Sequence, residues 1–204
     1  LLAARLKDGP PRRRGCTALC ASKDLAHWEV REPFYAPGLY YTHECPDLFQ
    51  MGDWWYLIFS EFTDANLTRY RMARSLAGPW LAPDADSFDG RAFYAAKTAG
   101  DGKQRYLFGW NPTRSGESDS GGWQWGGNLA VHEVWQRPEG TLAVRLPESV
   151  RAAFASPQPL QVEQVFNAEA ADPAEVEFHA QQRFSCAMLG PLPQKAYLET
   201  TATF

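Results

Sequence analysis

The chain has 204 residues, of which 45% are hydrophobic and 22% are charged, and its formal net charge is −4. This balance is typical of a globular protein and provides no basic surface for nucleic acid or an anionic membrane. No apolar run approaches the roughly 18 residues that a membrane-spanning helix needs. The aromatic content is high, with 8 Trp, 8 Tyr and 12 Phe. It favours carbohydrate binding only slightly, because β-sheet cores also use aromatic residues.

The four cysteines, Cys16, Cys20, Cys45 and Cys186, form no CxxC pair, and no His lies at a spacing that completes a zinc site. In an extended strand Cys16 and Cys20 share a face but lie too far apart for a disulfide. We therefore expect reduced, buried thiols, no metal, no cofactor and a cytoplasmic location. The chain opens at Leu1 without Met or a signal-peptide layout. Both of its ends interrupt strand-like runs, so we expect a piece of a longer protein.

Short β-type runs separated by turn signals recur along the chain, and helical periodicity is nearly absent. The first strands are expected at 1–6, 16–21 and 29–35, separated by turns at 8–14 and 22–28. A more complete unit follows, with strands at 44–50, 54–62 and 68–75 and a short outer strand after 78–81. The next unit repeats this plan, with strands at 92–99, 104–111, 128–136 and 141–146 and a polar Gly/Ser loop at 113–122.

These units have about 50 residues and four strands each, and a Ser…Leu…Trp turn recurs at 22–28 and 75–80. Periods of this size predict the blades of a β-propeller. An immunoglobulin-like sandwich also has short strands at this spacing, but it would not repeat the strand order. The expected fold class is all-β, with part of a β-propeller at 1–150. A linker and the beginning of a β-sandwich are expected at 151–204, with less regular strands at 175–184 and 197–204.

Residues 40–49, Tyr-Tyr-Thr-His-Glu-Cys-Pro-Asp-Leu-Phe, place two carboxylates, a thiol and an imidazole among aromatic rings. Pro46 cannot donate to a sheet ladder, so it belongs at an edge, at a strand start or at a bulge. A carboxylate at such a place fits a sugar-cleaving site, which needs an acid held protonated and a wall for the sugar ring. The alternative is an acidic strand end in which Glu44 pairs with an Arg.

In a propeller the first strand of each blade lines the central channel. Glu44 opens one such strand, and Phe93 and Tyr94 lie near the start of the equivalent strand in the next unit. The repeat therefore predicts an acid and two rings around one channel. Trp110 and Trp125 are candidate sugar contacts, and core or loop packing is the alternative for both.

The remaining polar candidates have structural alternatives. His43 is expected to be a partly exposed neighbour of Glu44, and Cys45 to shape the pocket floor. Asp47 points away from Glu44 in a regular strand; it is expected to be a structural hydrogen-bond acceptor unless a bulge at Pro46 re-aims it. Asp89 has the sequence context of a turn residue. With Glu44 as the catalytic residue, the candidate substrate-binding residues are His43, Cys45, Asp47, Asp89, Phe93, Tyr94, Trp110 and Trp125.

Residues 44–49, Glu-Cys-Pro-Asp-Leu-Phe, resemble the ECPDLF motif of glycoside hydrolase family 32, the invertase, levanase and inulinase family. Three segments in the family's order support this: 22–28, 89–95 and 107–110. The resemblance covers roughly 1–150 and implies a five-bladed β-propeller followed by a β-sandwich. It further implies a retaining glycosidase that cleaves β-fructofuranosidic bonds in sucrose or fructan-type oligosaccharides, with Glu44 as the general acid/base.

Family members carry an Asp nucleophile in an NDPNG segment and a stabilising Asp in an RDP segment, and neither occurs in this sequence. Both are expected before Leu1, so we expect the parent protein to be active and this chain alone to be inactive. Residues 123–128 also depart from the family's usual Pro-Arg-Glu run, which leaves other furanosides open as substrates. The alternatives are a non-catalytic carbohydrate-binding propeller and a furanosidase like those of family 43, most of which invert.

Overall fold

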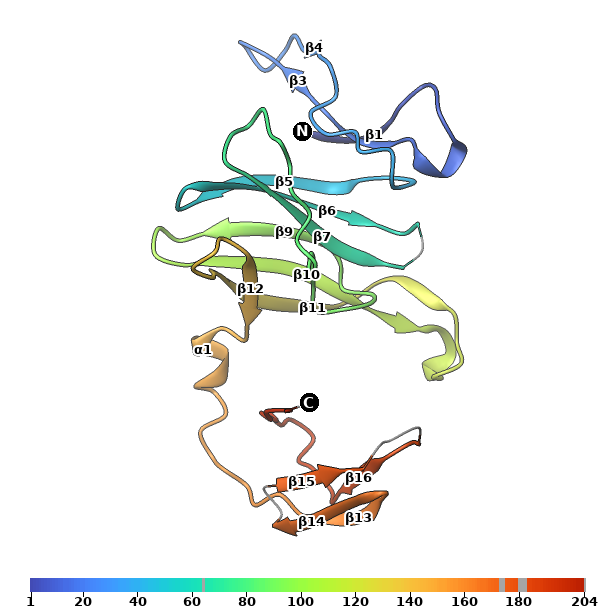
Figure 1. Cartoon of the computed structure of the whole chain (residues 1–204), viewed down its shortest axis with the longest axis vertical. Helices are drawn as coiled ribbons and strands as arrows, with labels where there is room; N and C mark the ends of the chain where they lie inside the picture. Colours follow the sequence, from blue (N-terminus) through green and yellow to red (C-terminus); the bar gives the residue numbers. More distant parts are fainter. Residues whose placement is uncertain (64, 173–174, 180–182, 204) are drawn as a thin grey trace. The chain divides into compact units, whose positions relative to one another are not determined.

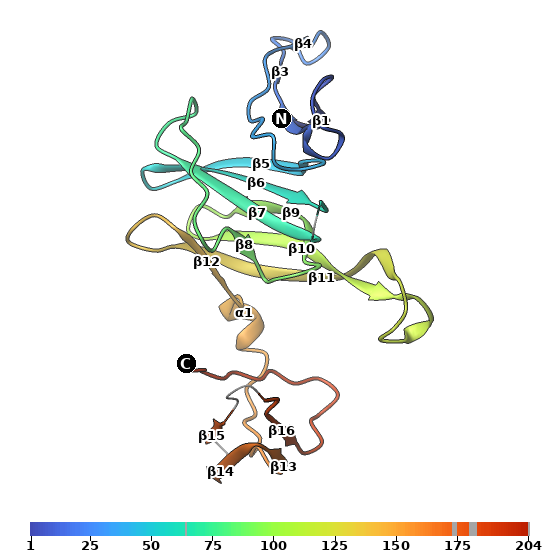
Figure 2. The same cartoon turned by 45° about the vertical axis from the view of Figure 1, so that its right-hand side comes forward.

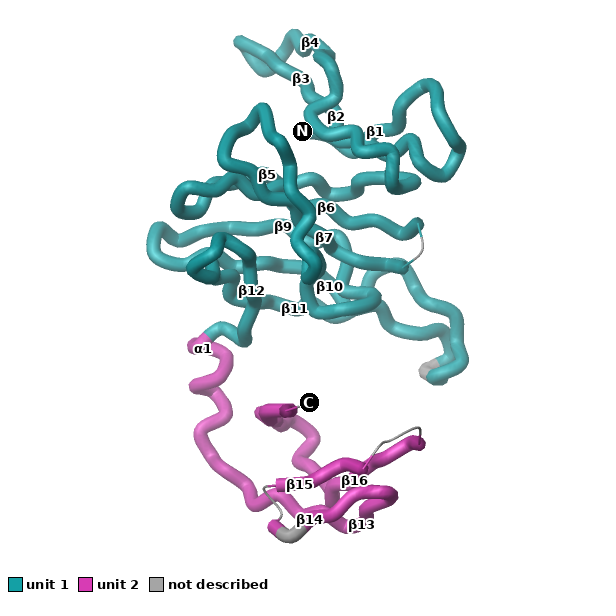
Figure 3. Tube along the Cα trace, in the orientation of Figure 1, with its two compact units in different colours: residues 1–147 teal, residues 148–204 magenta. Residues whose placement is uncertain are grey.

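The computed structural model describes residues 1–63, 65–172, 175–179 and 183–203 and is all-β (Figure 1). The chain divides into two compact units, Leu1–Pro147 and Glu148–Phe204 (Figure 3). Helix in the described residues is limited to one short α-helix, α1 (Glu148–Arg151), and two 3₁₀ turns, η1 (Pro11–Arg13) and η2 (Ser115–Glu117). None of these described helices is long and apolar enough to cross a membrane.

The first unit contains two four-stranded antiparallel sheets whose strands neighbour one another in chain order. The first sheet consists of β5 (Glu44–Met51), β6 (Trp54–Glu61), β7 (Leu67–Ala73) and β8 (Ser87–Phe88). The second consists of β9 (Tyr94–Gly100), β10 (Arg105–Arg114), β11 (Trp123–Gln136) and β12 (Leu142–Arg145). The strand plan predicted from the sequence therefore repeats, and the two sheets lie next to each other in both views (Figures 1 and 2).

The short outer strand expected after 78–81 is β8, which pairs with β7 at the edge of the first sheet. At 78–81 itself the described pairing is an isolated bridge between Met72 and Leu81. Pro79 and Pro83 lie on either side of this bridge, and proline has no N–H to donate to a ladder.

The hairpin of β10 and β11 is longer than expected. Pairing continues to Arg114 and Trp123 across a bulge, so part of the predicted polar loop is strand. Gly127 permits this pairing because a Cβ at that position would lie 2.0 Å from the Asn111 carbonyl oxygen. The result is a hairpin arm that extends beyond the rest of the sheet (Figure 2).

An apolar core lies between the two sheets. It is formed by Phe49, Tyr56, Ile58, Tyr70, Met72 and Phe88 of the first sheet, by Ala96, Leu107, Val134 and Leu142 of the second, and by Phe93 just before β9. Burying each large apolar side chain contributes roughly 1.5–3 kcal/mol. The Tyr70 hydroxyl in this core accepts a hydrogen bond from the Leu142 N–H at 3.1 Å. This packing fixes β5 and β9 relative to each other.

The N-terminal residues form two small ribbons. The hairpin of β1 (Leu2–Arg5) and β2 (Gly15–Ala18) precedes the pair of β3 (Cys20–Ala21) and β4 (Glu29–Val30). The strand expected at 29–35 is thus shorter, and Tyr35 makes only a bridge with Thr17. All four cysteines are free. Cys16 is buried, whereas Cys20, Cys45 and Cys186 are only partly buried. The prediction that the thiols are buried was therefore wrong for three of the four cysteines.

The second unit contains two ribbons. β13 (Val162–Phe166) pairs with β16 (Cys186–Leu189), and β14 (Ala168–Asp172) pairs with β15 (Glu175–Phe178). The strand expected at 175–184 ends at Phe178 among the described residues, and 197–203 is not a strand. A run of β-forming residues becomes a strand only when a neighbour pairs with it. The expected division into blades up to residue 150 and a β-sandwich beyond it stays a prediction.

Candidate active site

The candidate acid, Glu44, is the first residue of β5 and is partly buried. The strand is irregular directly after it: Glu44 pairs with Ser60 and Asp47 with Ile58, so Cys45 and Pro46 both lie opposite Phe59. Cys45 has a φ of 49°, a conformation uncommon outside glycine. Such a bulge bends a strand and re-aims its side chains. A bulge, one of the three placements that the sequence allowed for Pro46, is therefore present.

Tyr94 occupies the same place in the second sheet. It is the first residue of β9, and it precedes Ala95, whose φ is 54°. Here Ala95 and Ala96 lie opposite Gly109. Gly109 is required because a Cβ there would lie 2.5 Å from the Phe93 ring. Each sheet thus opens with a site residue followed by a left-handed residue at a bulge.

The two bulged strands bring Glu44 and Tyr94 together. The Tyr94 hydroxyl donates a hydrogen bond to Glu44 Oε2 at 2.7 Å, between residues 50 apart in sequence. Burial first, and then the hydrogen bond and negative charge of Glu44, raise the pKa of Tyr94. The phenol therefore stays a neutral donor. It occupies one carboxyl oxygen of Glu44 and restricts the orientation of the other.

The β5 bulge is tied to β9 by polar contacts. Lys97 Nζ donates to the Pro46 carbonyl oxygen at 2.7 Å. Asp47 Oδ2 accepts hydrogen bonds from the Thr98 N–H and the Thr98 hydroxyl, each at 2.7 Å. Asp47 is thus held as a structural hydrogen-bond acceptor, the expected alternative to a substrate contact.

Cys45 lies beside the acid and is partly buried. Burial, and then the negative charge of Glu44, raise the pKa of its thiol, and the Lys97 ammonium only partly offsets this. The side chain therefore behaves as a neutral, weakly polar group next to Glu44. It is not activated as a nucleophile, because thiolate formation is what nucleophilic cysteines need.

The ring of Tyr94 forms a cluster with the indoles of Trp110 and Trp125. Its ring centroid lies 5.6 Å from that of Trp110 and 5.4 Å from that of Trp125, and the two indoles are 5.5 Å apart. Trp110 is partly buried, whereas Trp125 is 73% exposed. Trp110 comes from β10 and Trp125 from the arm of β11. The cluster therefore presents an aromatic face to solvent directly beside the Glu44–Tyr94 pair.

Asp89 is not in contact with Glu44 in any described interaction; its Oδ2 lies 2.9 Å from His132 Nε2. It is exposed, and its φ of 57° is typical of the turn residue that the sequence also allowed. Phe93 was expected to face the channel, but it precedes β9 and packs edge-on against His132 as part of the apolar core. Tyr94 is equally buried, and its hydroxyl reaches Glu44. Of the two rings expected at the channel, only Tyr94 therefore has a described contact with the acid.

His43 was expected to be partly exposed, and this was wrong. Its side chain is fully buried and stacks on Phe59 with a centroid separation of 4.3 Å, with Tyr35 and Tyr40 also against it. Nδ1 lies 3.3 Å from the Thr17 hydroxyl, and Nε2 has no hydrogen-bond partner among the described residues. Burial, and then the charge of Arg71, lower the pKa of His43 to about 3.

This burial predicts a pH-dependent stability. In the unfolded chain a His titrates near pH ~6.5, so acidification protonates the unfolded state before the folded one. The stability contribution falls as the pH drops from about 6.5 towards 3. Between pH 7 and pH 4 the loss is about 3 kcal/mol. His43→Phe keeps a stacked ring that cannot be protonated. Its unfolding free energy, measured with urea at pH 7 and pH 4, should therefore fall by about 3 kcal/mol less than that of the unchanged protein. Equal falls in both proteins would contradict the assignment.

Several residues of the site were not predicted from the sequence: Ser60, Thr68 and Lys97. Ser60 and Thr68 are fully buried hydroxyls, joined to each other at 3.0 Å. The available signal was weak, because Ser60 is simply a polar residue at the end of the apolar run 54–59. The length of the Lys97 side chain lets it reach Pro46 across the two strands, and that contact has no local pattern.

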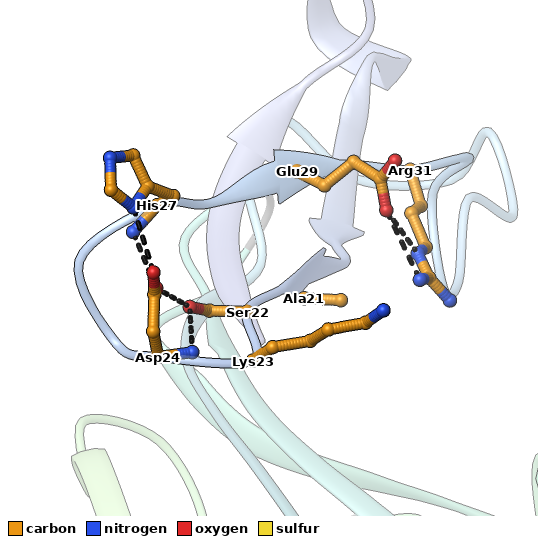
Figure 4. Close-up of a pocket in the computed structure, with 7 residues that line it drawn as sticks. All are labelled: Ala21, Ser22, Lys23, Asp24, His27, Glu29 and Arg31. Atoms are coloured by element: carbon orange, nitrogen blue, oxygen red, sulfur yellow. Dashed lines mark hydrogen bonds and ion pairs between the residues drawn. The ribbon is translucent and has the colours of Figure 1, made fainter.

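An open pocket of about 370 Å³ lies elsewhere, at the turn 21–31 (Figure 4). One side carries a hydrogen-bonded turn of Ser22, Asp24 and His27, and the other an ion pair of Glu29 and Arg31. It contains none of the predicted site residues. Among the described residues, no group of three or more His, Cys, Asp or Glu side chains could hold a metal ion.

Solved structures match parts of this chain. The Bombyx mori GH32 β-fructofuranosidase BmSUC1 matches with a TM-score of 0.53 and 21% identity, over 71% of this chain and 34% of that protein. An exo-1,5-α-L-arabinanase from a bovine ruminal metagenomic library matches with a TM-score of 0.35 and 11% identity, over 50% of this chain and 38% of that one. A search of curated proteins found no match.

The Bombyx mori enzyme shares the fold of this chain. The matched part of this chain spans 34% of that enzyme's length. The family profile described as the glycosyl hydrolases family 32 N-terminal domain matches residues 7–139. That range contains Glu44, Tyr94 and both indoles of the aromatic cluster. The chain belongs to glycosyl hydrolase family 32.

Proposed function

We propose that this chain is part of a retaining glycoside hydrolase that cleaves β-fructofuranosidic bonds in sucrose or fructans, with Glu44 as the general acid/base. The observation that carries this proposal is the Glu44–Tyr94 hydrogen bond of 2.7 Å inside the family 32 domain, beside an exposed aromatic face. A carboxyl group oriented by a neutral donor, next to rings, has the chemistry that glycosidic bond cleavage requires.

The proposal includes the architecture. The two four-stranded sheets repeat one strand order, and their first strands, β5 and β9, begin with the two bonded site residues. We infer that they are consecutive blades of a five-bladed propeller, whose first strands line a common channel. The expected roles of Trp110 and Trp125 as a sugar platform follow from this placement, because both rings border the opening of β9.

The mechanism follows from a retaining reaction with two carboxyl groups about 5–5.5 Å apart. Glu44, protonated on Oε1, donates this proton to the leaving glycosidic oxygen while an Asp carboxylate attacks the anomeric carbon. The bond to the leaving oxygen breaks and a glycosyl-enzyme ester forms. Glu44, now a carboxylate, takes a proton from water, which attacks the same carbon and releases the Asp. Throughout, Tyr94 donates to Oε2 and keeps Oε1 directed at the reacting oxygen.

The nucleophile is proposed to lie outside these 204 residues, because the sequence contains neither an NDPNG nor an RDP segment. The isolated chain is therefore expected to release no sugar. The indoles and Glu44 can still contact one, so weak binding without turnover is compatible with the same surface.

A substrate screen tests the proposal. The intact natural protein should hydrolyse sucrose, inulin or levan, and NMR of the first product formed should show retention of anomeric configuration. Inversion, or preference for arabinofuranosides, would favour the family 43-like alternative. Binding of these sugars with no turnover would favour the non-catalytic alternative. The same assays on the isolated chain serve as the control, in which no hydrolysis is expected.

A further inference from the structure

Two buried hydroxyls surround the backbone of Tyr94. Ser60 and Thr68 are fully buried, and their oxygens lie 3.0 Å apart. The Thr68 hydroxyl donates to the Phe93 carbonyl oxygen at 3.0 Å, and the Ala95 N–H donates to the Ser60 oxygen at 3.0 Å. The contacted groups are the carbonyl before Tyr94 and the amide after it. Both peptide groups that flank Tyr94 are therefore held.

The direction of these hydrogen bonds is determined. A hydroxyl has one proton to donate, and that of Thr68 is used on Phe93. The Ser60 hydroxyl must therefore donate to Thr68 while it accepts from Ala95. The result is one chain of donors that runs from the Ala95 amide through Ser60 and Thr68 to the Phe93 carbonyl. Removing either hydroxyl leaves a buried group without its partner, which is costly.

The position of these hydroxyls in the first sheet is equally specific. Glu44 pairs with Ser60, and Ser60 pairs with Thr68, so the three residues form one row across β5, β6 and β7. The row that contains Glu44 therefore also holds the backbone of Tyr94, the residue whose hydroxyl donates to Glu44. Ala95, which is part of the hydrogen-bonded chain, has a φ of 54°. A left-handed non-glycine residue persists only where its surroundings enforce it.

We propose that Ser60 and Thr68 are positioning residues, whose linked hydroxyls hold the bulged backbone at Tyr94 so that its phenol stays on Glu44. They contact no substrate and act only through Tyr94. This inference rests on the proposed role of Glu44, and a displacement of about 1 Å in such a group lowers turnover by up to about 100-fold.

The kinetic test compares Thr68→Val with Thr68→Ser in the intact natural protein. The valine keeps the volume and removes the hydroxyl, whereas the serine keeps the hydroxyl and removes a methyl group. We expect kcat to fall about 10- to 100-fold in Thr68→Val with KM nearly unchanged, and Thr68→Ser to restore most of it. Ser60→Ala should reproduce the loss, which keeps the test decisive if Thr68→Val does not fold. Equal losses in Thr68→Val and Thr68→Ser would overturn the proposal.

A double-mutant cycle with Tyr94→Phe separates positioning from general damage. If the hydroxyls act through Tyr94, Thr68→Val should cause little further loss of kcat in the Tyr94→Phe background. Independent losses that multiply would overturn the proposal, because they would show that Thr68 acts by another route.

Amide hydrogen exchange supplies a readout that does not depend on catalysis. In Thr68→Val and Ser60→Ala the Ala95 amide should exchange at least about 10-fold faster, while the amides of Leu57 and Ile58 keep their rates. Unchanged protection at Ala95 would overturn the proposal. If the Ala95 amide loses protection but Glu44→Gln leaves turnover unchanged, the hydrogen bonds from Ala95 through Ser60 and Thr68 to Phe93 are confirmed, and the proposed function of Glu44 is refuted.

Discussion

Replacing Glu44 by Gln in the intact natural protein is expected to lower turnover of sucrose or fructan by about 10²–10⁴-fold. The amide has nearly the same shape and can still accept the Tyr94 hydrogen bond, so the fold should be retained. It cannot protonate the leaving oxygen or take a proton from water. Both steps of a retaining reaction are therefore slowed, and steady-state kinetics with a circular dichroism check of folding would measure the effect.

The loss should depend on the leaving group. A fructoside whose leaving group is stable as an anion does not need protonation, so the first step should be largely spared in Glu44→Gln. Added azide, which attacks without a general base, should then accelerate the second step and yield a fructosyl azide. Glu29→Gln is the matched control, because Glu29 is a solvated carboxylate paired with Arg31. Near-normal turnover in Glu44→Gln would refute the assignment.

Asp86→Asn is expected to destabilise the protein by roughly 3–5 kcal/mol. The Asp86 carboxylate accepts from Arg69 Nη1 and Arg71 Nη1, each at 2.6 Å. Arg71 is fully buried, and its other described partners are neutral: the hydroxyls of Tyr35 and Tyr40 and a backbone carbonyl. The amide removes the charge that balances Arg71 and leaves a buried cation with only neutral partners.

Urea unfolding at pH 7 would measure this loss. Asp53→Asn is the matched control, because Asp53 is 91% exposed in its side chain and lies 3.6 Å from Arg74. An exposed pair of this kind contributes about 0–1 kcal/mol. If both variants lost the same small amount, the buried network would not stabilise the fold as proposed. Arg69 would not be left without a partner, because Glu61 Oε1 also accepts from it at 2.9 Å.

The order of the strands was accessible from the sequence because it depends on local chemistry. Alternating and apolar runs separated by glycine-containing turns place β5, β6 and β7 within a few residues of their predicted bounds. The repetition of this plan in β9–β12 was likewise visible as a period of about 50 residues. The placement of Glu44 at the beginning of a strand follows from the same pattern. Pro46 allowed a bulge as one of three placements, and the sequence did not choose among them.

The contacts of the site residues were decided only by the tertiary structure. Whether His43 or Phe93 faces solvent depends on which side of the chain meets the neighbouring sheet, and a single bulge reverses that choice. Tyr94 reaches Glu44 across 50 residues of sequence, and its backbone is held by hydroxyls from β6 and β7. No local pattern encodes such a contact, because it exists only once two sheets have packed and two bulged strands have turned their side chains toward each other.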